Sequence, residues 1–170
     1  MYTFTAPNGF TTSQSFDQNK TPISSDLSSV YLVGAGEYVM DLTNSYGGAT
    51  TIGSGTLTAT GTNSFGQSSG IYVGTSTNLG SNATLNINTA GGTVNNAIFV
   101  SGTGLNTIEG TNAGTVTYSG NVALSTNVTL TASLASGDVI FAGNIAGSGT
   151  VTVSGAGTVT LLGSLSLIHI

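Results

Sequence analysis

Charge is what this sequence has least of. Only 4% of its 170 residues are charged, and one cation stands against six acids, for a formal net charge of -5. A chain whose single cation is Lys20 cannot neutralise a series of phosphates, so nucleic acid is excluded as a partner. Disordered chains usually reach that state through high charge, whereas 38% of this chain is hydrophobic, so we expect it to fold.

Cysteine is absent as well, which excludes a disulfide framework and thiolate metal sites. No run of about 18 apolar residues occurs, so this segment is not expected to span a membrane as a helix. The amino terminus, Met1-Tyr-Thr3, lacks the positive charge that opens a signal peptide. If the protein is exported, we expect its signal upstream of this fragment.

Glycine and small polar residues take the place of charged residues in this sequence. The chain has 26 Gly, and from about Gly36 onward short runs alternate apolar with Ser, Thr or Asn, as in Thr56-Leu-Thr-Ala-Thr60 and Asn127-Val-Thr-Leu-Thr131. This two-residue period is typical of half-buried strands, and the glycines between the runs supply turns. The sequence therefore predicts an all-β fold with short strands and frequent corners.

Internal repetition favours a solenoid over a sandwich. Four segments share one pattern, and each ends in a glycine: Ile98-Phe-Val-Ser-Gly102, Val116-Thr-Tyr-Ser-Gly120, Val139-Ile-Phe-Ala-Gly143 and Val159-Thr-Leu-Leu-Gly163. The distances along the chain between these glycines predict coils of about 18–23 residues. Such coils are typical of a parallel β-helix (β-solenoid).

Longer matches support the same repeat. Tyr118-Ser-Gly-Asn-Val-Ala123 matches Phe141-Ala-Gly-Asn-Ile-Ala146 at a constant offset, and Ile71-Tyr-Val73 is a looser match to Ile98-Phe-Val100. Stacked coils place equivalent side chains only ~4.8 Å apart. Like charges would repel along the whole axis at that spacing, which accounts for the low charge.

The repeat divides the chain into three parts. Residues 1–35 contain no obvious copy and are interpreted as a non-repetitive leader or an incomplete coil. Residues 36–164 are the predicted β-helix repeats. Residues 165–170, Leu165-Ser-Leu-Ile-His-Ile170, break the pattern and resemble a translated transposase adapter, so we interpret them as a non-native tail, with a genuine final strand as the alternative.

Residues 34–58 contain three short motifs in order, Asn44-Ser-Tyr46, Thr50-Thr-Ile52 and Gly55-Thr-Leu57. This segment resembles the autotransporter-associated β-strand repeat. In that family a strand ending in an Asn-x-Tyr turn precedes a Thr-Thr-Ile strand and a Gly-Thr-Leu strand. Further likeness lies in Gly61-Thr-Asn-Ser-Phe-Gly66 and in residues 155–163.

The resemblance implies a right-handed parallel β-helix that forms part of a bacterial passenger domain. Such a passenger is secreted or displayed at the outer membrane, and its parent chain is linked to an outer-membrane β-barrel. The implied function is that of a structural or adhesive segment, an adhesin surface whose partners are glycans or proteins of host or neighbouring cells. The implied location is extracellular or on the cell surface.

Enzymes also use parallel β-helices, so catalytic chemistry has to be considered. The acids are dispersed, and the closest pair, Glu37 and Asp41, is interpreted as a solvated surface pair. The other acids are Asp17, Asp26, Glu109 and Asp138. The one His, His169, lies in the suspected tail. We therefore predict no enzyme, no catalytic, cofactor-binding or metal-binding residue, and no cofactor.

Two alternatives to the adhesive segment stay open. The first is a non-catalytic part of a β-helix carbohydrate-active enzyme whose catalytic coils lie outside this fragment. The second, less favoured, is an ice-binding solenoid, because flat threonine arrays can order water. It rests on five triplets, at residues 56–58, 115–117, 129–131, 150–152 and 158–160, whose uneven spacing predicts that they do not share one face.

Overall fold

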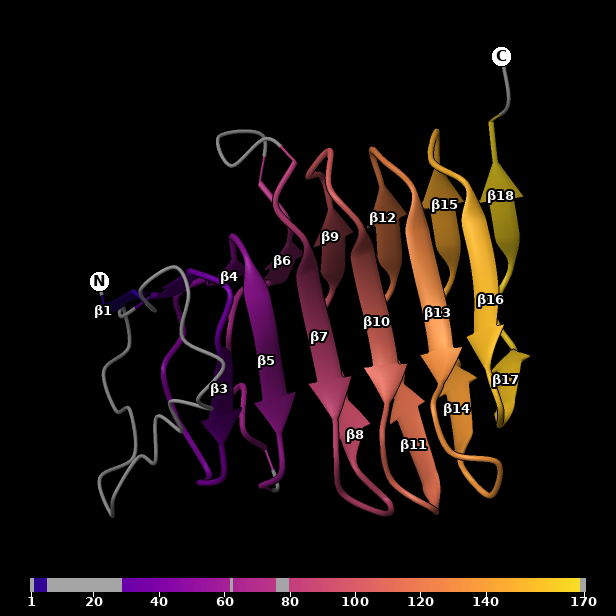
Figure 1. The fold of residues 1–170 in the computed structure, drawn as a ribbon, viewed down its shortest axis with the longest axis horizontal. Helices are drawn as coiled ribbons and strands as arrows, with labels where there is room; N and C mark the ends of the chain where they lie inside the picture. The colour runs from indigo at the N-terminus through magenta and orange to yellow at the C-terminus, as the bar shows by residue number, and fades with distance from the viewer. Residues whose placement is uncertain (1, 6–28, 62, 76–79, 169–170) are drawn as a thin grey trace.

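The fold is a parallel β-solenoid built entirely from strands and loops. The computed structural model describes residues 2–5, 29–61, 63–75 and 80–168, and this part of the chain contains strands but no helix. Figure 1 shows the strands side by side along the long axis, from β1 at the amino-terminal end to β18 at the carboxy-terminal end. About six coils stack in this way.

Three parallel sheets form the sides of the solenoid. The eight-stranded sheet contains, in spatial order, β1 (Tyr2–Thr5), β2 (Val30–Val33), β4 (Thr50–Ile52), β6 (Ile71–Val73), β9 (Ile98–Val100), β12 (Val122–Leu124), β15 (Ile145–Gly147) and β18 (Leu165–Leu167). The six-stranded sheet contains β3 (Glu37–Met40), β5 (Gly55–Ala59), β7 (Ala83–Ile87), β10 (Asn106–Gly110), β13 (Val128–Ala132) and β16 (Val151–Gly155). The four-stranded sheet contains β8 (Thr93–Val94), β11 (Thr115–Tyr118), β14 (Asp138–Phe141) and β17 (Thr158–Leu161).

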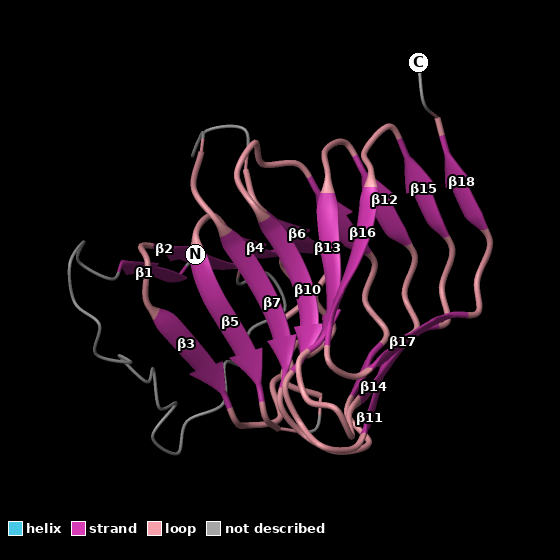
Figure 2. Ribbon diagram, turned by 45° about the vertical axis from the view of Figure 1, so that its right-hand side comes forward, coloured by secondary structure: helices cyan, strands magenta, loops and turns pink. Residues whose placement is uncertain are grey.

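Each later coil passes through the three sheets in turn, which can be followed in the turned view of Figure 2. Strand partners reveal how much of the chain one coil takes, because partners occupy equivalent places in neighbouring coils. Glu37 pairs with Thr56 in a short coil, whereas Gly55 pairs with Ala83 in a distinctly longer one. The parallel β-solenoid is therefore confirmed, and the coil after Gly55 is longer than the glycine spacing predicts.

The register confirms most of the predicted repeat. Tyr118 pairs with Phe141, and Ile71 pairs with Ile98, at the offsets read from the sequence. The match between residues 98–102 and 116–120 is wrong, because β9 lies in the eight-stranded sheet and β11 in the four-stranded sheet. Strands of different sheets share the same two-residue alternation, so pattern alone aligned them.

Columns of apolar side chains fill the interior. One column of the six-stranded sheet runs through Tyr38, Leu57, Leu85, Ile108, Leu130 and Val153. In the four-stranded sheet the rings of Tyr118 and Phe141 stack with centroids 5.0 Å apart, and both are buried. Burying such side chains contributes about 1.5–3 kcal/mol each, and this is the main source of stability in a chain without disulfides.

A small polar cluster lies inside the early coils. The buried Tyr46 hydroxyl lies 2.7 Å from the hydroxyl of Thr50, which lies 3.0 Å from that of Ser68. The Ser68 hydroxyl donates to the carbonyl of Gly70, so the hydroxyl chain ends on the backbone. Burial raises the pKa of Tyr46 to about 12, against the opposing effect of its hydrogen bond to Thr50.

Strands also occur at both ends of the predicted repeat region. Within residues 1–35, β1 pairs with β2, and β2 pairs with β4 of the next coil. At the other end, β18 pairs with β15, and residues 169–170 lie outside the described residues. The adapter origin of residues 165–170 stays a prediction, which the encoding nucleotides test.

The threonine triplets divide between two sheets, as their spacing predicted. Those at residues 56–58, 129–131 and 150–152 belong to the six-stranded sheet, and those at 115–117 and 158–160 to the four-stranded sheet. The outer face of the six-stranded sheet nevertheless carries one column of five threonines: Thr56, Thr84, Thr107, Thr129 and Thr152. Its neighbouring column includes Asn86 and Glu109, so the two columns do not form a continuous threonine array.

Candidate functional site

A groove opens where the third side of the solenoid begins. After β7, β10, β13 and β16 the chain enters the four-stranded sheet, whereas after β5 it forms a turn over residues 63–67. The edge of the four-stranded sheet, β8, therefore faces a loop instead of a strand. A cavity of about 270 Å³ lies between them.

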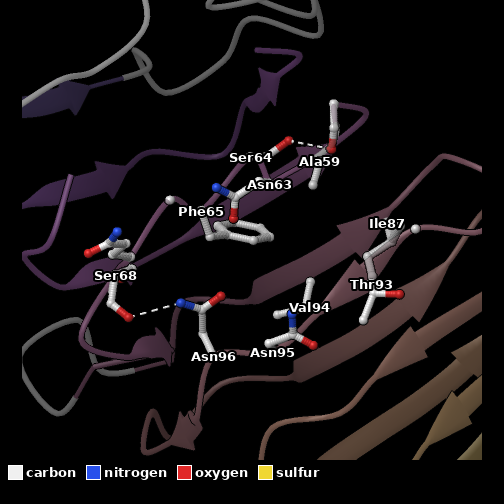
Figure 3. Close-up of a pocket in the computed structure, with 14 residues that line it drawn as sticks. Ala59, Asn63, Ser64, Phe65, Ser68, Ile87, Thr93, Val94, Asn95 and Asn96 are labelled. Carbon is white, nitrogen blue, oxygen red and sulfur yellow. Dashed lines mark hydrogen bonds between the residues drawn. The ribbon is translucent and has the colours of Figure 1, made fainter. Parts of the chain in front are cut away.

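Hydrogen bonds close the groove at both ends. At one end the Thr89 hydroxyl donates to the carbonyl of Thr60 over 2.9 Å. At the other end the side-chain amide of Asn96 donates to the carbonyl of Ser68 over 2.9 Å, the contact drawn in Figure 3. Between these ends, no backbone hydrogen bond joins β8 to residues 63–67, all of which belong to the described part of the chain, so the two coils part there.

The free edge of β8 follows from its pairing with β11. The backbone amides of Thr117 and Ser119 donate to the carbonyls of Gly92 and Val94, each over 2.8 Å. Backbone groups alternate in direction along a strand. The backbone N–H and C=O of Thr93 therefore point away from β11, toward the groove.

The loop opposite β8 is held by its own turns. Asn63 has a left-handed backbone with φ of 56°, and the amides of Gly66 and Ser68 donate back to the carbonyls of Asn63 and Phe65, each over 3.0 Å. The backbone amide of Gln67 donates to the backbone carbonyl of Tyr46. This turn cannot offer β8 the row of donors and acceptors that a strand would.

The groove combines an apolar floor with an uncharged polar rim. Figure 3 shows Phe65 and Val94 among the lining residues, and both side chains are buried. Exposed amide and hydroxyl side chains surround them: Asn63, Gln67, Thr93 and Asn95. Because the lining residues are all uncharged, the site favours a neutral ligand.

Comparison with protein-family models, curated proteins and solved structures finds no significant match.

The acids singled out in the sequence do not gather at the groove. Glu37 begins β3, whereas Asp41 follows the end of β3 and is exposed. Asp138 begins β14 and is exposed. Asp17, Asp26, Lys20 and His169 lie outside the described residues. No set of three potential metal ligands occurs among the residues that the structure describes.

Glu37 and Glu109 instead take part in two sets of side-chain hydrogen bonds on the six-stranded sheet. The Thr58 hydroxyl donates to the carboxylate of Glu37 over 2.6 Å, and the Asn86 amide donates to Thr58 over 3.3 Å. Ser133 donates to the carboxylate of Glu109 over 3.3 Å. Sequence reasoning missed these hydrogen bonds because each joins residues of different coils.

Partial burial changes the pKa of Glu109. Desolvation raises the pKa of its carboxyl group above the usual value, the hydrogen bond from Ser133 opposes that shift, and the negative charge of Glu37 adds to it. A perturbed carboxyl pKa can mark a catalytic acid or base. The contacts of Glu109 and Glu37, however, are hydrogen bonds that tie neighbouring coils together, and this geometry supports a structural role.

No helix in the described part of the chain is long and apolar enough to cross a membrane.

The groove was not predicted from the sequence. The available signal was the segment Gly61-Thr-Asn-Ser-Phe-Gly-Gln-Ser-Ser-Gly70, which lacks the apolar alternation that a third-sheet strand needs.

Proposed function

We propose that this chain is a structural and adhesive segment of a secreted or surface-displayed protein of the autotransporter-passenger type. The uncharged groove beside β8 carries the proposal, because it combines an apolar floor with exposed amides and hydroxyls and its lining contains no acidic, basic or histidine side chain. Stacked sheets give this groove a firm support, as rigid elements hold binding groups more precisely than loops do.

A second surface feature supports adhesion. Tyr72 and Phe99 stack on the outer face of the eight-stranded sheet with ring centroids 4.9 Å apart, and Tyr72 is 37% exposed. Exposed aromatic side chains are enriched at recognition sites because they bury a large area at little entropic cost. The molecule thus presents two neutral surfaces, and the proposed partners are neutral glycans or cell-surface proteins.

Adhesion of beads coated with the chain to glycan arrays and to cells tests the proposal. The variant Gln67→Glu places a charge at the rim of the groove, and we expect it to reduce adhesion by about tenfold, since burying an unpaired charge is costly. Thr129→Glu adds the same charge to the threonine column, on a strand inside the six-stranded sheet and away from the groove, and serves as the matched control. Equal adhesion of wild type and Gln67→Glu would overturn the role of the groove.

The enzyme alternative has its own test. Incubating the chain with neutral and acidic polysaccharides and measuring reducing ends would show hydrolysis or elimination. We expect none. The full-length gene then separates an adhesive passenger from an enzyme segment, because further coils with clustered Asp and Lys or Arg would identify the enzyme.

A further inference from the structure

The groove beside β8 offers backbone groups as well as side chains. Within the described part of the chain β8 pairs with β11 alone, and its other edge faces the cavity. A strand edge with unpaired N–H and C=O groups is a template for another strand. Proteins that recognise peptides by strand addition use such an edge.

We propose that the groove binds a short, uncharged, extended peptide segment, which adds as a strand to the free edge of β8. This inference rests on the proposed adhesive function and names the partner class of its site. The peptide's backbone pairs with the N–H and C=O of Thr93, completing a side of the solenoid that begins only at β8.

The two closed ends of the groove limit the length of the peptide. The contacts Thr89 to Thr60 and Asn96 to Ser68 hold the coils together on either side. On the β8 side the groove is lined by Gly92, Thr93, Val94 and Asn95 before Asn96 closes it, so about four extended residues fit along it. The volume of about 270 Å³ lies just below the usual range of about 300–1,000 Å³ for small-ligand pockets, which also favours a short ligand.

The lining predicts the sequence pattern of the peptide. Side chains of a strand point alternately to the two faces, so one set would meet the apolar floor at Phe65 and Val94 and the other the polar rim at Gln67 and Asn95. An alternation of small apolar residues with Thr or Ser fits both. Charged residues would leave an unpaired charge, because the lining offers no partner of opposite sign.

Fluorescence anisotropy with a labelled, capped peptide tests the inference. The probe is Thr-Val-Thr-Val, the sequence of residues 150–153, whose four residues alternate small apolar side chains with Thr. We expect saturable binding to the full chain. The same peptide N-methylated at alternate residues lacks half of its strand donors, and at least one of the two alternation patterns should bind about tenfold more weakly.

Two protein variants test whether the backbone edge of β8 is the binding element. Thr93→Pro removes an edge N–H that does not serve β11, and proline is tolerated on edge strands. We expect it to weaken binding about tenfold, with an unchanged far-UV circular dichroism spectrum. Thr107→Ala, in the threonine column outside the groove, is the control and should leave binding unchanged.

Three results would overturn the inference. They are no binding at millimolar peptide, equal binding of both N-methylated peptides and the parent, and a loss with Thr107→Ala as large as with Thr93→Pro. If Thr93→Pro fails to fold, the N-methylated peptides still decide. Retained adhesion of the chain to a glycan without peptide binding would reject strand addition while the adhesive function stands.

Discussion

At the scale of single residues, Gly55 shows how closely the coils approach one another. Its φ is 81°, and a Cβ atom there would lie 2.4 Å from the carbonyl oxygen of Gly34 and 2.5 Å from that of Gly36. Both the backbone conformation and the neighbouring coil therefore require glycine at this corner.

Gly55→Ala should lower the free energy of unfolding by about 2–5 kcal/mol, the sum of left-handed strain and overpacking. Gly91→Ala is the matched control, because Gly91 has a similar φ of 76° but open space around the missing Cβ. It should cost only about 1–2 kcal/mol. Thermal unfolding followed by circular dichroism compares the two, and equal losses would contradict the close approach at Gly55.

A second residue-scale prediction concerns the pH dependence of Glu109. Because burial raises its pKa in the folded state, the folded chain holds this proton to higher pH than the unfolded chain does. Stability therefore falls as pH rises from the ordinary Glu pKa of about 4.3 through the raised value. Glu109→Gln should unfold at a higher temperature than wild type at pH 7, and the difference should vanish at about pH 3.5.

Thermal melts at several pH values check this prediction. A Glu109→Gln variant with the same advantage at about pH 3.5 as at pH 7 would assign the effect to packing or hydrogen bonding. A variant less stable than wild type at pH 7 would show that the hydrogen bond from Ser133 outweighs desolvation.

At the scale of elements, the inner column of the six-stranded sheet provides a graded test. Leu130 is fully buried, whereas Val153, its partner in the last coil, is 56% exposed. Leu130→Ala should cost about 2–5 kcal/mol through lost burial and a cavity. Val153→Ala should cost under about 1 kcal/mol. Urea unfolding measures both, and a Val153→Ala loss as large as that of Leu130→Ala would show the last coil to be covered.

The strands themselves were largely predictable, since alternation and glycine spacing located β11, β14 and their partners. The sheet to which each strand belongs was not predictable, because β9 and β11 carry the same apolar alternation. They differ only in which side of the coil they occupy. A register between residues 98 and 116 looked as good as the true one between residues 98 and 122. Only the corners distinguish the sheets, and their sequences are short and rich in glycine.

The groove escaped prediction for a related reason. It results from residues 63–67 forming a turn where later coils have a strand of the four-stranded sheet. The segment between β5 and β6 is about as long as the segment between β7 and β9, so coil length gives no sign of the difference. A binding site created by a missing strand is thus hard to see for a method that looks for regular spacing.

At the scale of the whole molecule, the carboxy-terminal coil leaves three sheet edges without a neighbour in the described part of the chain. β16, β17 and β18 each end their sheet, and Leu162, Leu165 and Ile168 are exposed there. Residues 139–168 contain no Asp, Glu, Lys or Arg, and charged side chains usually protect such edges. We expect the isolated chain to self-associate.

Sedimentation velocity over a range of protein concentrations measures this association. Val153→Lys places a charge at the open edge and should shift the chain toward monomer by about tenfold in dissociation constant. Thr107→Lys adds the same charge to the middle of the threonine column and is the control. A wild-type monomer at high concentration with one sharp melt would contradict the prediction.

The pairing of each strand with the one a single coil later gives the molecule a natural unit of length. Val122 pairs with Ile145 and Val128 pairs with Val151, which is the same step along the chain in two different sheets. Removing residues 122–144 would therefore join two equivalent positions. The shortened chain should keep every column, become one layer shorter and retain its circular dichroism spectrum per residue. A solenoid of this kind can change its reach in steps of ~4.8 Å, while the groove at β8 stays as it is.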